Sequence, residues 1–589
     1  MKTTDLITIA REKASAWLDE AYDDDTRREV QRMLDDDNTA PLVDAFYKDL
    51  EFGTGGLRGI TGAGTNRVNA YTIGTATQGF ARYINRRFAG QPRSACVGHD
   101  CRHGSRHFAE TVASIFSANG IEVYLFESLR PTPEISFAIR ELGCKAGVII
   151  TASHNPREYN GYKAYGEDGA QFVPPRDADL LREIENTRVA DIRFQRDPAL
   201  VRPLGDGMDR LYLERVRQLR LNPGAPRAAR DLNIVFTPLH GTTYRLVPAS
   251  LRLWGFTGVH AVPAQETPDG DFPTVATANP EDPAAFKMAI DVARDVNANL
   301  VMACDPDGDR VGFVVKNSHG EWVYLDGNQA YVIFLEYIIR GKRAAGQLPA
   351  DAYIVKTIVT TELARDIAVA NGIACHDVYT GFKWIADAIR RHGPDGYIAG
   401  GEESFGFMPG TFTRDKDGVA AASLMAEIAA WCKINGSSIH EFLEEIHVTR
   451  GYSRERLVQV TRHGAAGARE INDMMKRLRD TPPSRVNDVD VTLVKDYLTR
   501  QTLDPRDGTR AAIDVDTPAD VLQLYLADGS KISARPSGTE PKIKFYFETR
   551  VPARDRDDLP RARAVADRRV DAMIAAIVPP AADTPTPGR

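Results

Sequence analysis

The chain has 589 residues, of which 43% are hydrophobic and 26% charged, so it has enough apolar material for several domains. Its 74 basic and 81 acidic side chains give a formal net charge of −7, which argues against a general nucleic-acid-binding protein, because such binding needs a basic face. No stretch approaches about eighteen apolar residues without a charge, so the sequence predicts no membrane span.

The N-terminal residues and the cysteines indicate the compartment. Residues 1–18 mix charged and apolar side chains without an apolar core, so we expect no signal peptide. The six cysteines form no Cys-x-x-Cys pair and are scattered along the chain, at Cys96, Cys101, Cys144, Cys304, Cys375 and Cys432. Scattered thiols are typical of a reducing compartment, and we expect a cytoplasmic location.

The predicted elements begin with an acidic helical segment over residues 1–47, followed by a β-α-β-α-β pattern that occurs three times. The first copy has strand 95–98, helix 105–118, strand 121–126, helix 133–142 and strand 146–151. The second has strand 233–237, helix 244–254, strand 259–262, helix 283–296 and strand 300–304. The third has strand 353–359, helix 361–370, strand 375–379, helix 383–391 and strand 397–399.

The last part of the chain has a different pattern, with helix 471–478, several strands up to 542–548 and helix 561–577. The prediction is therefore an α/β fold of three related β-α-β-α-β domains with mixed or parallel sheets, plus a smaller α+β C-terminal domain. Four prolines among the last eleven residues predict a disordered tail. The expected segments are 1–47, 48–205, 206–325, 326–450, 451–578 and 579–589.

A polar loop follows the last strand of each copy. Residues 151–156 read Thr-Ala-Ser-His-Asn-Pro, residues 305–310 read Asp-Pro-Asp-Gly-Asp-Arg, and residues 401–406 read Gly-Glu-Glu-Ser-Phe-Gly. In open α/β sheets, ligands bind beyond the carboxyl ends of the strands. We therefore expect the three loops to contribute to one active site in a central cleft.

The second of these loops has the composition of a metal site. Asp305, Asp307 and Asp309 alternate, so in an extended segment their carboxylates would point to one side. Carboxylates at such short separations repel one another unless a cation lies among them. A site whose ligands are all oxygen atoms favours Mg²⁺. An EF-hand would need Gly and Glu where this chain has Arg310 and Lys316, and a haloacid-dehalogenase-type phosphatase would need Thr or Ser in place of Asp309. A solvated acidic turn is the remaining alternative.

Ser153, in the first loop, is the candidate nucleophile. It lacks the flanking glycines of a nucleophile elbow, and a neighbouring Ser-His pair cannot form a hydrolase triad by itself. A lone loop serine would usually be structural. Beside a metal loop and anion-binding loops it favours phosphoryl transfer, because the metal and cations neutralise charge while the hydroxyl carries the group.

Two further segments can bind anions. Residues 535–541 read Arg-Pro-Ser-Gly-Thr-Glu-Pro, in which a guanidinium, two hydroxyls and a glycine backbone form a pocket for a dianionic phosphate. Residues 53–59 are rich in glycine and contain one cation, Arg58, but they lack the lysine spacing of a Walker motif.

These loops, in this order, resemble the α-D-phosphohexomutase family over about residues 48–550, and more closely its phosphoglucomutase and phosphopentomutase branch. The four segments 151–156, 305–310, 401–406 and 535–539 are similar to the phosphoserine, Mg²⁺, sugar and phosphate loops of the family. The resemblance implies phosphoserine, metal-binding, sugar-binding and phosphate-binding domains around one cleft. It also implies interconversion of a sugar 1-phosphate and 6-phosphate, with glucose as the expected sugar and pentose or mannose as alternatives, through a phosphoserine and a sugar bisphosphate.

The resemblance also implies a role for each matching residue. Ser153 would carry the phosphoryl group and, with Asp305, Asp307 and Asp309, would hold Mg²⁺. The implied catalytic residues are Ser153, His154, Arg58, Lys163 and Arg310. The implied substrate-binding residues are Thr380, Gly381, Lys383, Glu402, Ser404, Lys416, Arg535, Ser537, Gly538 and Thr539. Glucose 1,6-bisphosphate is the expected activator and a small phosphosugar the expected partner, with no nucleic acid or membrane, in a monomer or homodimer.

One departure from the family changes the expected proton transfer. Bifunctional mannose/glucose mutases keep a histidine shortly after the sugar-loop serine, where this chain has Phe405 and Gly406. A histidine relay is therefore not expected, and Lys163 or Lys416 is the candidate instead. The Glu-Glu-Ser-Phe sequence is also more similar to glucose-type members.

Two functions from other classes use similar residues. A Mg²⁺-dependent sugar phosphatase would need a water-activating base and no second phosphate pocket, and it would release free phosphate. A non-catalytic binding protein of this fold would be expected to lack at least one chemical residue. The serine, the three aspartates and Arg535 are all present, which favours the mutase.

Overall fold

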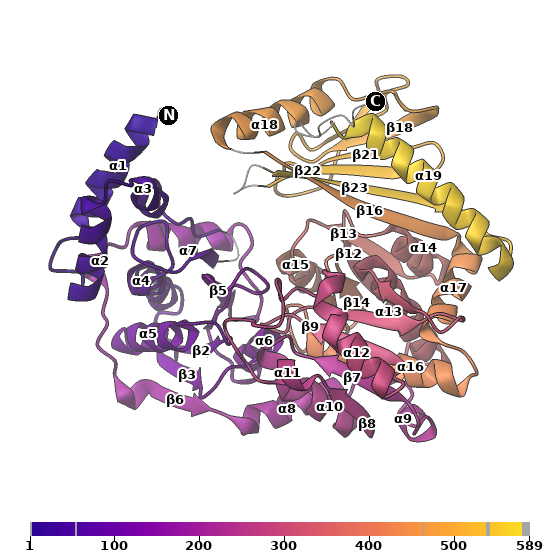
Figure 1. The fold of residues 1–589 in the computed structure, drawn as a ribbon, viewed down its shortest axis with the longest axis horizontal. Helices are drawn as coiled ribbons and strands as arrows, with labels where there is room; N and C mark the ends of the chain where they lie inside the picture. The colour runs from indigo at the N-terminus through magenta and orange to yellow at the C-terminus, as the bar shows by residue number, and fades with distance from the viewer. Residues whose placement is uncertain (1–2, 54–55, 463, 538–541, 580–589) are drawn as a thin grey trace. The chain divides into compact units, whose positions relative to one another are not determined.

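The computed structural model describes residues 3–53, 56–462, 464–537 and 542–579, which fall into two units (Figure 1). The first unit comprises Met1–Lys356 and Ile373–Ile439. The second comprises Thr357–Gly372 and His440–Arg589. The third β-α-β-α-β copy thus contributes one of its helices to the second unit.

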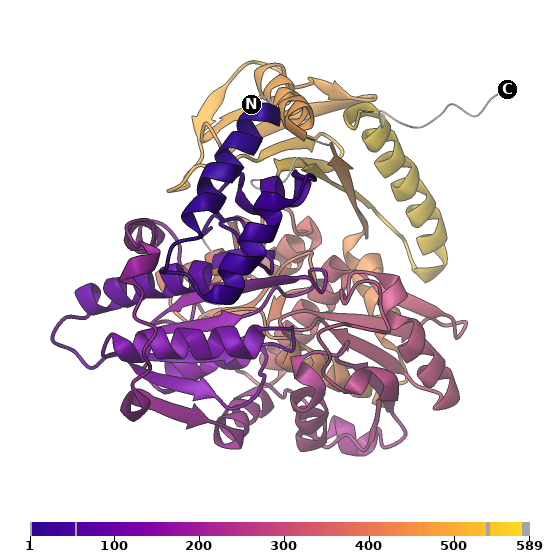
Figure 2. The same ribbon diagram turned by 60° about the vertical axis from the view of Figure 1, so that its left-hand side comes forward.

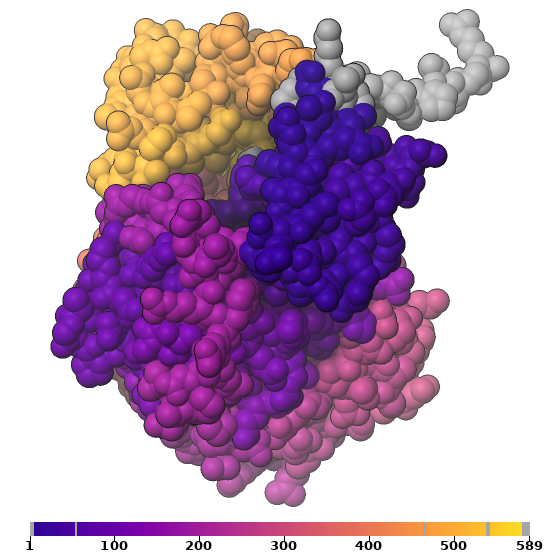
Figure 3. Space-filling model, turned by 90° about the vertical axis from the view of Figure 1, so that its left-hand side faces the viewer, coloured from indigo at the N-terminus to yellow at the C-terminus, as the bar shows by residue number. Residues whose placement is uncertain are grey.

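The N-terminal segment is helical, as predicted, and the structure divides it into α1 (Thr3–Ala16), α2 (Asp24–Asp35) and α3 (Ala40–Phe46). Asp23 caps α2 by accepting a hydrogen bond from Thr26 N. The apolar sides of the helices bury Trp17, Val30 and Phe46 together with Tyr71 of the first sheet domain. In Figure 3 these helices, in indigo, lie against the purple residues of that domain. The acidic segment is therefore packed on one side and solvated on the other.

Each predicted copy forms the expected elements. The first consists of β2 (Ser94–His99), α5 (Ser105–Ala118), β3 (Glu122–Phe126), α6 (Thr132–Glu141) and β4 (Ala146–Ile150). The second consists of β7 (Asn233–Thr237), α10 (Leu246–Trp254), β8 (Gly258–Ala261), α12 (Lys287–Asp295) and β9 (Leu300–Cys304). The third consists of β12 (Tyr353–Thr357), α14 (Glu362–Ala370), β13 (Ala374–Val378), α15 (Phe382–His392) and β14 (Tyr397–Gly401). Short 3₁₀ turns, η3 (Thr242–Tyr244) and η4 (Pro283–Phe286), precede α10 and α12, where the sequence predicted continuous helices.

The three copies share one strand order, with the first strand in the centre: β4-β2-β3, β9-β7-β8 and β14-β12-β13. In each, the third strand then pairs antiparallel with the next strand, which is β5 (Tyr159–Gly166), β10 (Val311–Lys316) or β15 (Phe407–Met408). The sheets are therefore mixed, as predicted. The three polar loops are the equivalent hairpin connections of the three sheets, so the fold places them at corresponding positions.

Additional strands and helices complete the first unit. The full sheet orders are β1-β5-β4-β2-β3-β6 and β11-β10-β9-β7-β8, where the added strands are β1 (Gly56–Ile60), β6 (Val201–Leu204) and β11 (Trp322–Leu325). The long added helices are α4 (Ala70–Arg87), α8 (Asp206–Arg217), α13 (Gly327–Ala344) and α16 (Gly418–Ile434). The short ones are α7 (Arg176–Glu185), α9 (Ala225–Ala228), α11 (Pro263–Glu266), η1 (Val189–Asp191) and η2 (Pro198–Leu200).

Helices cover both faces of the first sheet. On one face, Val97 of β2 packs in a core with Phe80 of α4 and Phe116 of α5, the helices drawn in purple in Figure 2. On the other face, α6 approaches so closely that a Cβ added at Gly98 would lie 2.3 Å from Ile135 Cδ1. The result is the three-layered α/β/α arrangement that parallel strands require.

The second unit is built around one antiparallel sheet with the order β16-β23-β22-β21-β18-β19-β20 and β17 paired with β18. The strands are β16 (Tyr452–Thr461), β17 (Arg485–Val486), β18 (Val489–Asp496), β19 (Gln501–Leu503), β20 (Arg510–Ala512), β21 (Leu522–Leu526), β22 (Lys531–Pro536) and β23 (Lys542–Val551). The helices are α17 (Ile439–Arg450), α18 (Gly464–Asp480), η5 (Arg556–Asp558) and α19 (Leu559–Ile577). The predicted tail lies almost wholly outside the described residues, from residue 580 onward.

None of the six cysteines forms a disulfide bond, and four of them are buried. Among the described residues, none of the helices has both the length and the apolar composition needed to cross a bilayer.

Candidate active site

The aspartate loop, residues 305–310, follows β9 and forms a tight turn, so the expectation of an extended segment was wrong. Gly308 has a φ of 69°, and a Cβ added there would lie 2.4 Å from Thr243 Cγ2, so the turn requires glycine. The turn still gathers the side chains, because one carboxylate oxygen from each of the three aspartates lies within 4.8 Å of the others. All three aspartates are buried.

Two lysines neutralise part of this negative charge. Lys163 Nζ, on β5, lies 2.7 Å from Asp307 Oδ2 and 2.9 Å from Asp309 Oδ2. Lys416 Nζ lies 3.2 Å from the same Asp309 oxygen. Although burial opposes ionisation, the two ammonium groups lower the pKa of Asp309, and the carboxylates raise the pKa of both lysines. Both lysines therefore carry their protons in this state.

The aspartate cluster still contains buried carboxylate oxygens that none of the described residues satisfies. Asp307 Oδ1 and Asp309 Oδ1 have no hydrogen-bond partner among the residues that the structure describes. Burial and the neighbouring carboxylates raise the pKa of Asp305 well above its ordinary value. Buried carboxylate oxygens without partners are unfavourable, and a hard divalent cation would satisfy them. The three aspartates therefore fit Mg²⁺ by the chemistry of their donor atoms.

Ser153 lies beside this cluster in an unusual backbone conformation. Its φ of 52° is left-handed, which is uncommon for a residue other than glycine, and its N–H donates to Thr151 Oγ1 at 2.9 Å. The buried Ser153 Oγ donates to Asp305 Oδ2 at 2.7 Å. A hydroxyl from the first copy thus meets a carboxylate from the second copy.

Arg102, which no sequence motif predicted, holds the serine loop in place. Its guanidinium donates to Ser153 O at 2.6 Å, to Pro156 O at 2.7 Å and to Tyr159 O at 3.0 Å. Arg102 Nε lies 3.4 Å from Asp100 Oδ2, and both side chains are fully buried. The one available signal was an Asp-x-Arg sequence directly after the first strand of the copy, at the same sheet edge as the serine loop.

Replacing Arg102 by lysine should lower kcat by about tenfold or more while changing KM little. Lysine keeps the positive charge, but its single ammonium cannot donate to three separated carbonyls, so the serine hydroxyl would lose its fixed position. Initial rates and the free energy of unfolding should be measured for both proteins.

The matched control for this change is Arg157→Lys, at an exposed arginine whose ion pair with Asp271 spans 3.7 Å. Surface pairs of this kind contribute little, so the control should keep wild-type kcat. Equal effects of the two substitutions would show that Arg102 does not position the serine.

Thr132, the first residue of α6, is a second site residue that no sequence motif predicted. Its Oγ1 donates to Asp307 Oδ2 at 2.9 Å, and its N–H donates to Asp307 O at 2.8 Å. A third is Asp415, whose Oδ1 lies 3.0 Å from Lys416 Nζ while its Oδ2 accepts from Tyr165 OH at 2.8 Å. These contacts fix the orientation of one aspartate and one lysine of the cluster.

Three further candidates lie around the serine loop. Arg58, on β1, donates from Nη1 to Asn155 Oδ1 at 2.8 Å. Burial and the guanidinium groups of Arg310 and Arg58 lower the pKa of His154 to about 2, so its imidazole is neutral. The side chain of Arg310 pairs with Glu281, and its backbone N–H donates to Asp305 Oδ1 at 3.0 Å.

The sugar-loop candidates come from two neighbouring segments. Glu402 is buried after β14 and accepts from Gly381 N, which precedes α15. Burial and the adjacent Glu403 raise the pKa of Glu402 to about 7. Lys383 Nζ lies 5.5 Å from the ring centroid of Trp384. Thr380 adjoins Gly381, and Ser404 is partly buried in the loop itself.

This loop also contacts the aspartate loop. A β-bridge joins Arg310 to Gly406, and Val311 N donates to Phe405 O at 3.3 Å. The loops that follow β9 and β14 are therefore held together by the backbone.

The predicted phosphate loop belongs to the second unit. Arg535 lies on β22, paired in register with Lys544 of β23, and Ser537 N donates to Lys542 O at 2.8 Å. Gly538 and Thr539 lie outside the described residues.

Comparison with known proteins identifies the family. Three models of phosphoglucomutase/phosphomannomutase alpha/beta/alpha domains match: domain I over residues 49–190, domain II over 210–320 and domain III over 326–448. A phosphoglucomutase of Staphylococcus aureus (strain bovine RF122 / ET3-1) is 34% identical over 541 residues, covering 91% of this chain and 95% of the relative. That of strain N315 is 34% identical over 548 residues, covering 92% and 96%.

Solved structures show the same fold. A phosphoglucomutase/phosphomannomutase family protein from Burkholderia thailandensis superposes with a TM-score of 0.62 at 20% identity, covering 88% of this chain and 97% of the other. The phosphoglucomutase pp63/parafusin from Paramecium, in its open form, gives a TM-score of 0.64 at 17% identity, covering 91% and 97%.

The chain belongs to the phosphoglucomutase/phosphomannomutase family, the α-D-phosphohexomutases, as its four loops implied. It is a phosphohexomutase, an enzyme that isomerises its substrate by phosphoryl transfer.

Proposed function

We propose that this phosphohexomutase interconverts glucose 1-phosphate and glucose 6-phosphate through a phosphoserine at Ser153. The observation that carries the proposal is the 2.7 Å hydrogen bond from Ser153 Oγ to Asp305 Oδ2 in the aspartate cluster. Glucose is supported by the relatives at 34% identity, which are phosphoglucomutases, and by the Glu-Glu-Ser-Phe sequence of the sugar loop.

In the proposed reaction, the phosphoserine transfers its phosphoryl group to the free hydroxyl of a sugar monophosphate, which forms a bisphosphate. The bisphosphate then reorients within the active site and transfers its other phosphoryl group to Ser153 Oγ. Asp305, Asp307 and Asp309 would hold Mg²⁺, which neutralises charge on the transferring group when bound. Lys163 and Lys416 supply fixed positive charge, because their contacts with the aspartates keep them protonated. Burial and the guanidinium groups of Arg310 and Arg58 lower the pKa of His154, so a neutral imidazole would lie beside the phosphoserine.

The remaining candidates would bind the substrate. Glu402 would accept hydrogen bonds from sugar hydroxyls, and Ser404 would accept from them or donate to them. Thr380, Gly381 and Lys383 would contribute beside them. Arg58 would act near the serine through its contact with Asn155. The phosphate that is not transferred would be held by Arg535, Ser537, Gly538 and Thr539. Residues 48–205, 206–325, 326–450 and 451–578 would be the corresponding phosphoserine, metal, sugar and phosphate domains.

Glucose 1,6-bisphosphate is proposed as the activator. A serine without its phosphate cannot convert a monophosphate, because it has no phosphoryl group to give. A bisphosphate can restore the phosphoserine and leave as a monophosphate. Enzyme that loses its intermediate would therefore need added bisphosphate to resume turnover.

The test is a panel of initial rates on glucose, mannose, ribose and deoxyribose 1-phosphates with saturating Mg²⁺ and a small amount of glucose 1,6-bisphosphate. We expect the highest kcat/KM with glucose 1-phosphate and isomer formation far above free phosphate release. A higher kcat/KM for another sugar 1-phosphate would show that this sugar, and not glucose, is the preferred substrate. Release of phosphate without isomer formation would indicate a phosphatase.

Two substitutions should separate recognition of sugar from recognition of phosphate. Arg535→Ala should raise KM for every sugar in the panel by about ten- to a hundredfold, because a charge-assisted hydrogen bond contributes roughly 1.5–3 kcal/mol in ground and transition states alike. Glu402→Ala should instead change the ranking among the sugars, because its carboxyl would contact hydroxyls whose positions differ between them.

The control for Arg535 is Arg510→Ala, at an exposed arginine on β20 of the same sheet. It should keep the wild-type KM. If Arg535→Ala leaves KM unchanged and abolishes kcat, or alters the sugar ranking, the segment has another role.

A further inference from the structure

Helix α8 (Asp206–Arg217) links the first β-α-β-α-β copy to the second and packs against α6, α10 and α16. Two of its buried side chains, Asp209 and Tyr212, lie three residues apart and therefore on the same side of the helix. Neither belongs to the serine, aspartate or sugar loop. Both nevertheless bind segments that in turn contact the aspartate loop, residues 305–310.

Asp209 holds the loop that joins β3 to α6. Its Oδ1 accepts from Arg130 Nε at 2.8 Å, and the side chains of the two residues are only 9% and 4% exposed. Arg130 Nη1 also donates to Ser128 Oγ at 2.6 Å and to Leu129 O at 2.9 Å. The guanidinium therefore fixes the conformation of its own loop and attaches that loop to α8.

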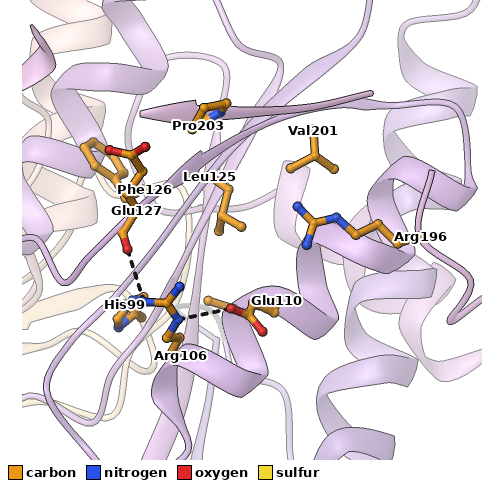
Figure 4. A pocket seen from close by; sticks show the side chains of 10 residues that line it. His99, Arg106, Glu110, Leu125, Phe126, Glu127, Arg196, Val201 and Pro203 are labelled. Carbon is orange, nitrogen blue, oxygen red and sulfur yellow. Dashed lines mark hydrogen bonds and ion pairs between the residues drawn. The ribbon is translucent and has the colours of Figure 1, made fainter. Parts of the chain in front are cut away.

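The same loop is also attached to the first sheet domain. Arg130 N donates to His99 O, at the end of β2, at 3.2 Å. Glu127 O accepts from Arg106 Nη1 of α5 at 3.2 Å, and Figure 4 shows this contact beside a surface pocket. These two contacts join the loop to its own domain, whereas the pair of Arg130 with Asp209 joins it to α8.

Glu134, in the first turn of α6, lies beside this pair without competing for it. Its carboxyl is fully buried, and its Oε2 lies 3.7 Å from Arg130 Nε. Burial and the neighbouring Asp209 raise the pKa of Glu134 well above its ordinary value, so Glu134 is protonated and neutral. The buried negative charge that pairs with Arg130 is therefore that of Asp209.

The far end of the loop contacts the aspartate loop directly. Pro131 packs on Gly308, where an added Cβ would lie 2.8 Å from Pro131 Cβ. Thr132 donates from Oγ1 to Asp307 Oδ2 at 2.9 Å and from its N–H to Asp307 O at 2.8 Å. A displacement of Arg130 would thus reach Asp307 through two residues of backbone.

Tyr212 makes the second connection. Its OH donates to Asp417 Oδ1 at 2.7 Å, and both side chains are almost completely buried. The next residue, Gly418, donates from N to Gly308 O at 3.2 Å, and an added Cβ at Gly418 would lie 2.6 Å from the same oxygen. The preceding residue, Lys416, contacts the aspartate cluster with its ammonium group. Tyr212 therefore restrains a segment that touches the aspartate loop with both backbone and side chain.

We propose that Asp209 and Tyr212 of α8 are positioning residues for the aspartate cluster, and that they act through Arg130 and Asp417. The inference rests on the proposed function, in which the three aspartates hold Mg²⁺. Partners that orient the ligands of a metal, without binding it themselves, typically change metal affinity or activity by about 10- to 100-fold when they are removed. Helix α8 restrains the cluster in this way through two separate contacts.

The first test compares Tyr212→Phe with Tyr337→Phe in the full chain. Each substitution removes one buried hydroxyl that donates to a buried carboxylate, because Tyr337 OH donates to Glu427 Oε1 at 2.8 Å. The two variants should lose similar amounts of unfolding free energy. Only Tyr212→Phe should raise the dissociation constant of Mg²⁺ in a calorimetric titration, by about tenfold. It should also lower kcat at saturating Mg²⁺ while leaving KM for glucose 1-phosphate unchanged.

The second test compares Asp209→Ala with Asp496→Ala. Asp496 is a buried aspartate of the second unit that accepts from Arg479 Nε at 3.1 Å, so both substitutions leave an arginine without its carboxylate. Asp209→Ala should raise the dissociation constant of Mg²⁺ by about tenfold or more, and Asp496→Ala should leave it unchanged. If Asp209→Ala does not fold, the comparison of the two tyrosine variants decides.

Two results would overturn the proposal. The first is a dissociation constant of Mg²⁺ for folded Tyr212→Phe within about threefold of the wild-type value. The second is an equal change in Tyr337→Phe, which would show a general effect of lost stability. Failure of the proposed function would instead appear in the wild type, which would then bind no Mg²⁺ or form no isomer.

Discussion

Ser153→Ala is expected to reduce mutase turnover on the order of 10⁴-fold or more. The substitution removes the only atom proposed to carry the phosphoryl group, and the neighbouring His154 is neutral, with its Nδ1 3.3 Å from Ser153 Oγ. The hydroxyl also donates to Asp305, so its loss leaves one more buried carboxylate oxygen without a partner. Binding of Mg²⁺ by the three aspartates should survive.

The measurement combines initial rates with mass spectrometry of the purified protein. Phosphate should be found within residues 151–156 of the wild type and not in the variant. Ser318→Ala is the matched control, because Ser318 lies in an exposed turn between β10 and β11 and the change removes the same hydroxyl. Wild-type turnover in Ser153→Ala would rule out the proposed mechanism.

Asp307→Ala should abolish tight Mg²⁺ binding and lower turnover on the order of 10³-fold, since a metal that neutralises transition-state charge contributes several kcal/mol. The fold should survive, because Lys163 keeps its contact with Asp309 at 2.9 Å. Calorimetric Mg²⁺ titration and the Mg²⁺ dependence of the initial rate are the two readouts.

Asp291→Ala is the control for the metal prediction. Asp291 lies on α12 and pairs with Arg294 at 2.8 Å on an exposed surface, so its loss should change neither readout. Full activity of the wild type in excess chelator would show that the reaction does not need the metal.

Much of the secondary structure could be predicted from local patterns. Helix α5 and strands β7 and β9 begin and end at the predicted residues, because short apolar strands and amphipathic helices give clear periodicities. Helix α16 was not predicted, because its sequence lacks such a periodicity. Its residues are buried on nearly all sides, so its sequence has no polar face and no helical period. The tight turn at 305–310 was also missed, because it depends on the left-handed conformation of Gly308.

The sequence by itself determined the family and the residue types of the site, because the serine, the three aspartates and the sugar-loop glutamate lie within short contiguous segments. Tertiary structure alone decided which of them meet. The hydrogen bond from Thr132 to Asp307 joins residues 175 positions apart, and that from Arg102 to Ser153 joins residues 51 positions apart. The first contact depends on how two separate sheet domains pack, and the second on the strand order within one sheet, in which β4 lies beside β2. No local periodicity records either arrangement.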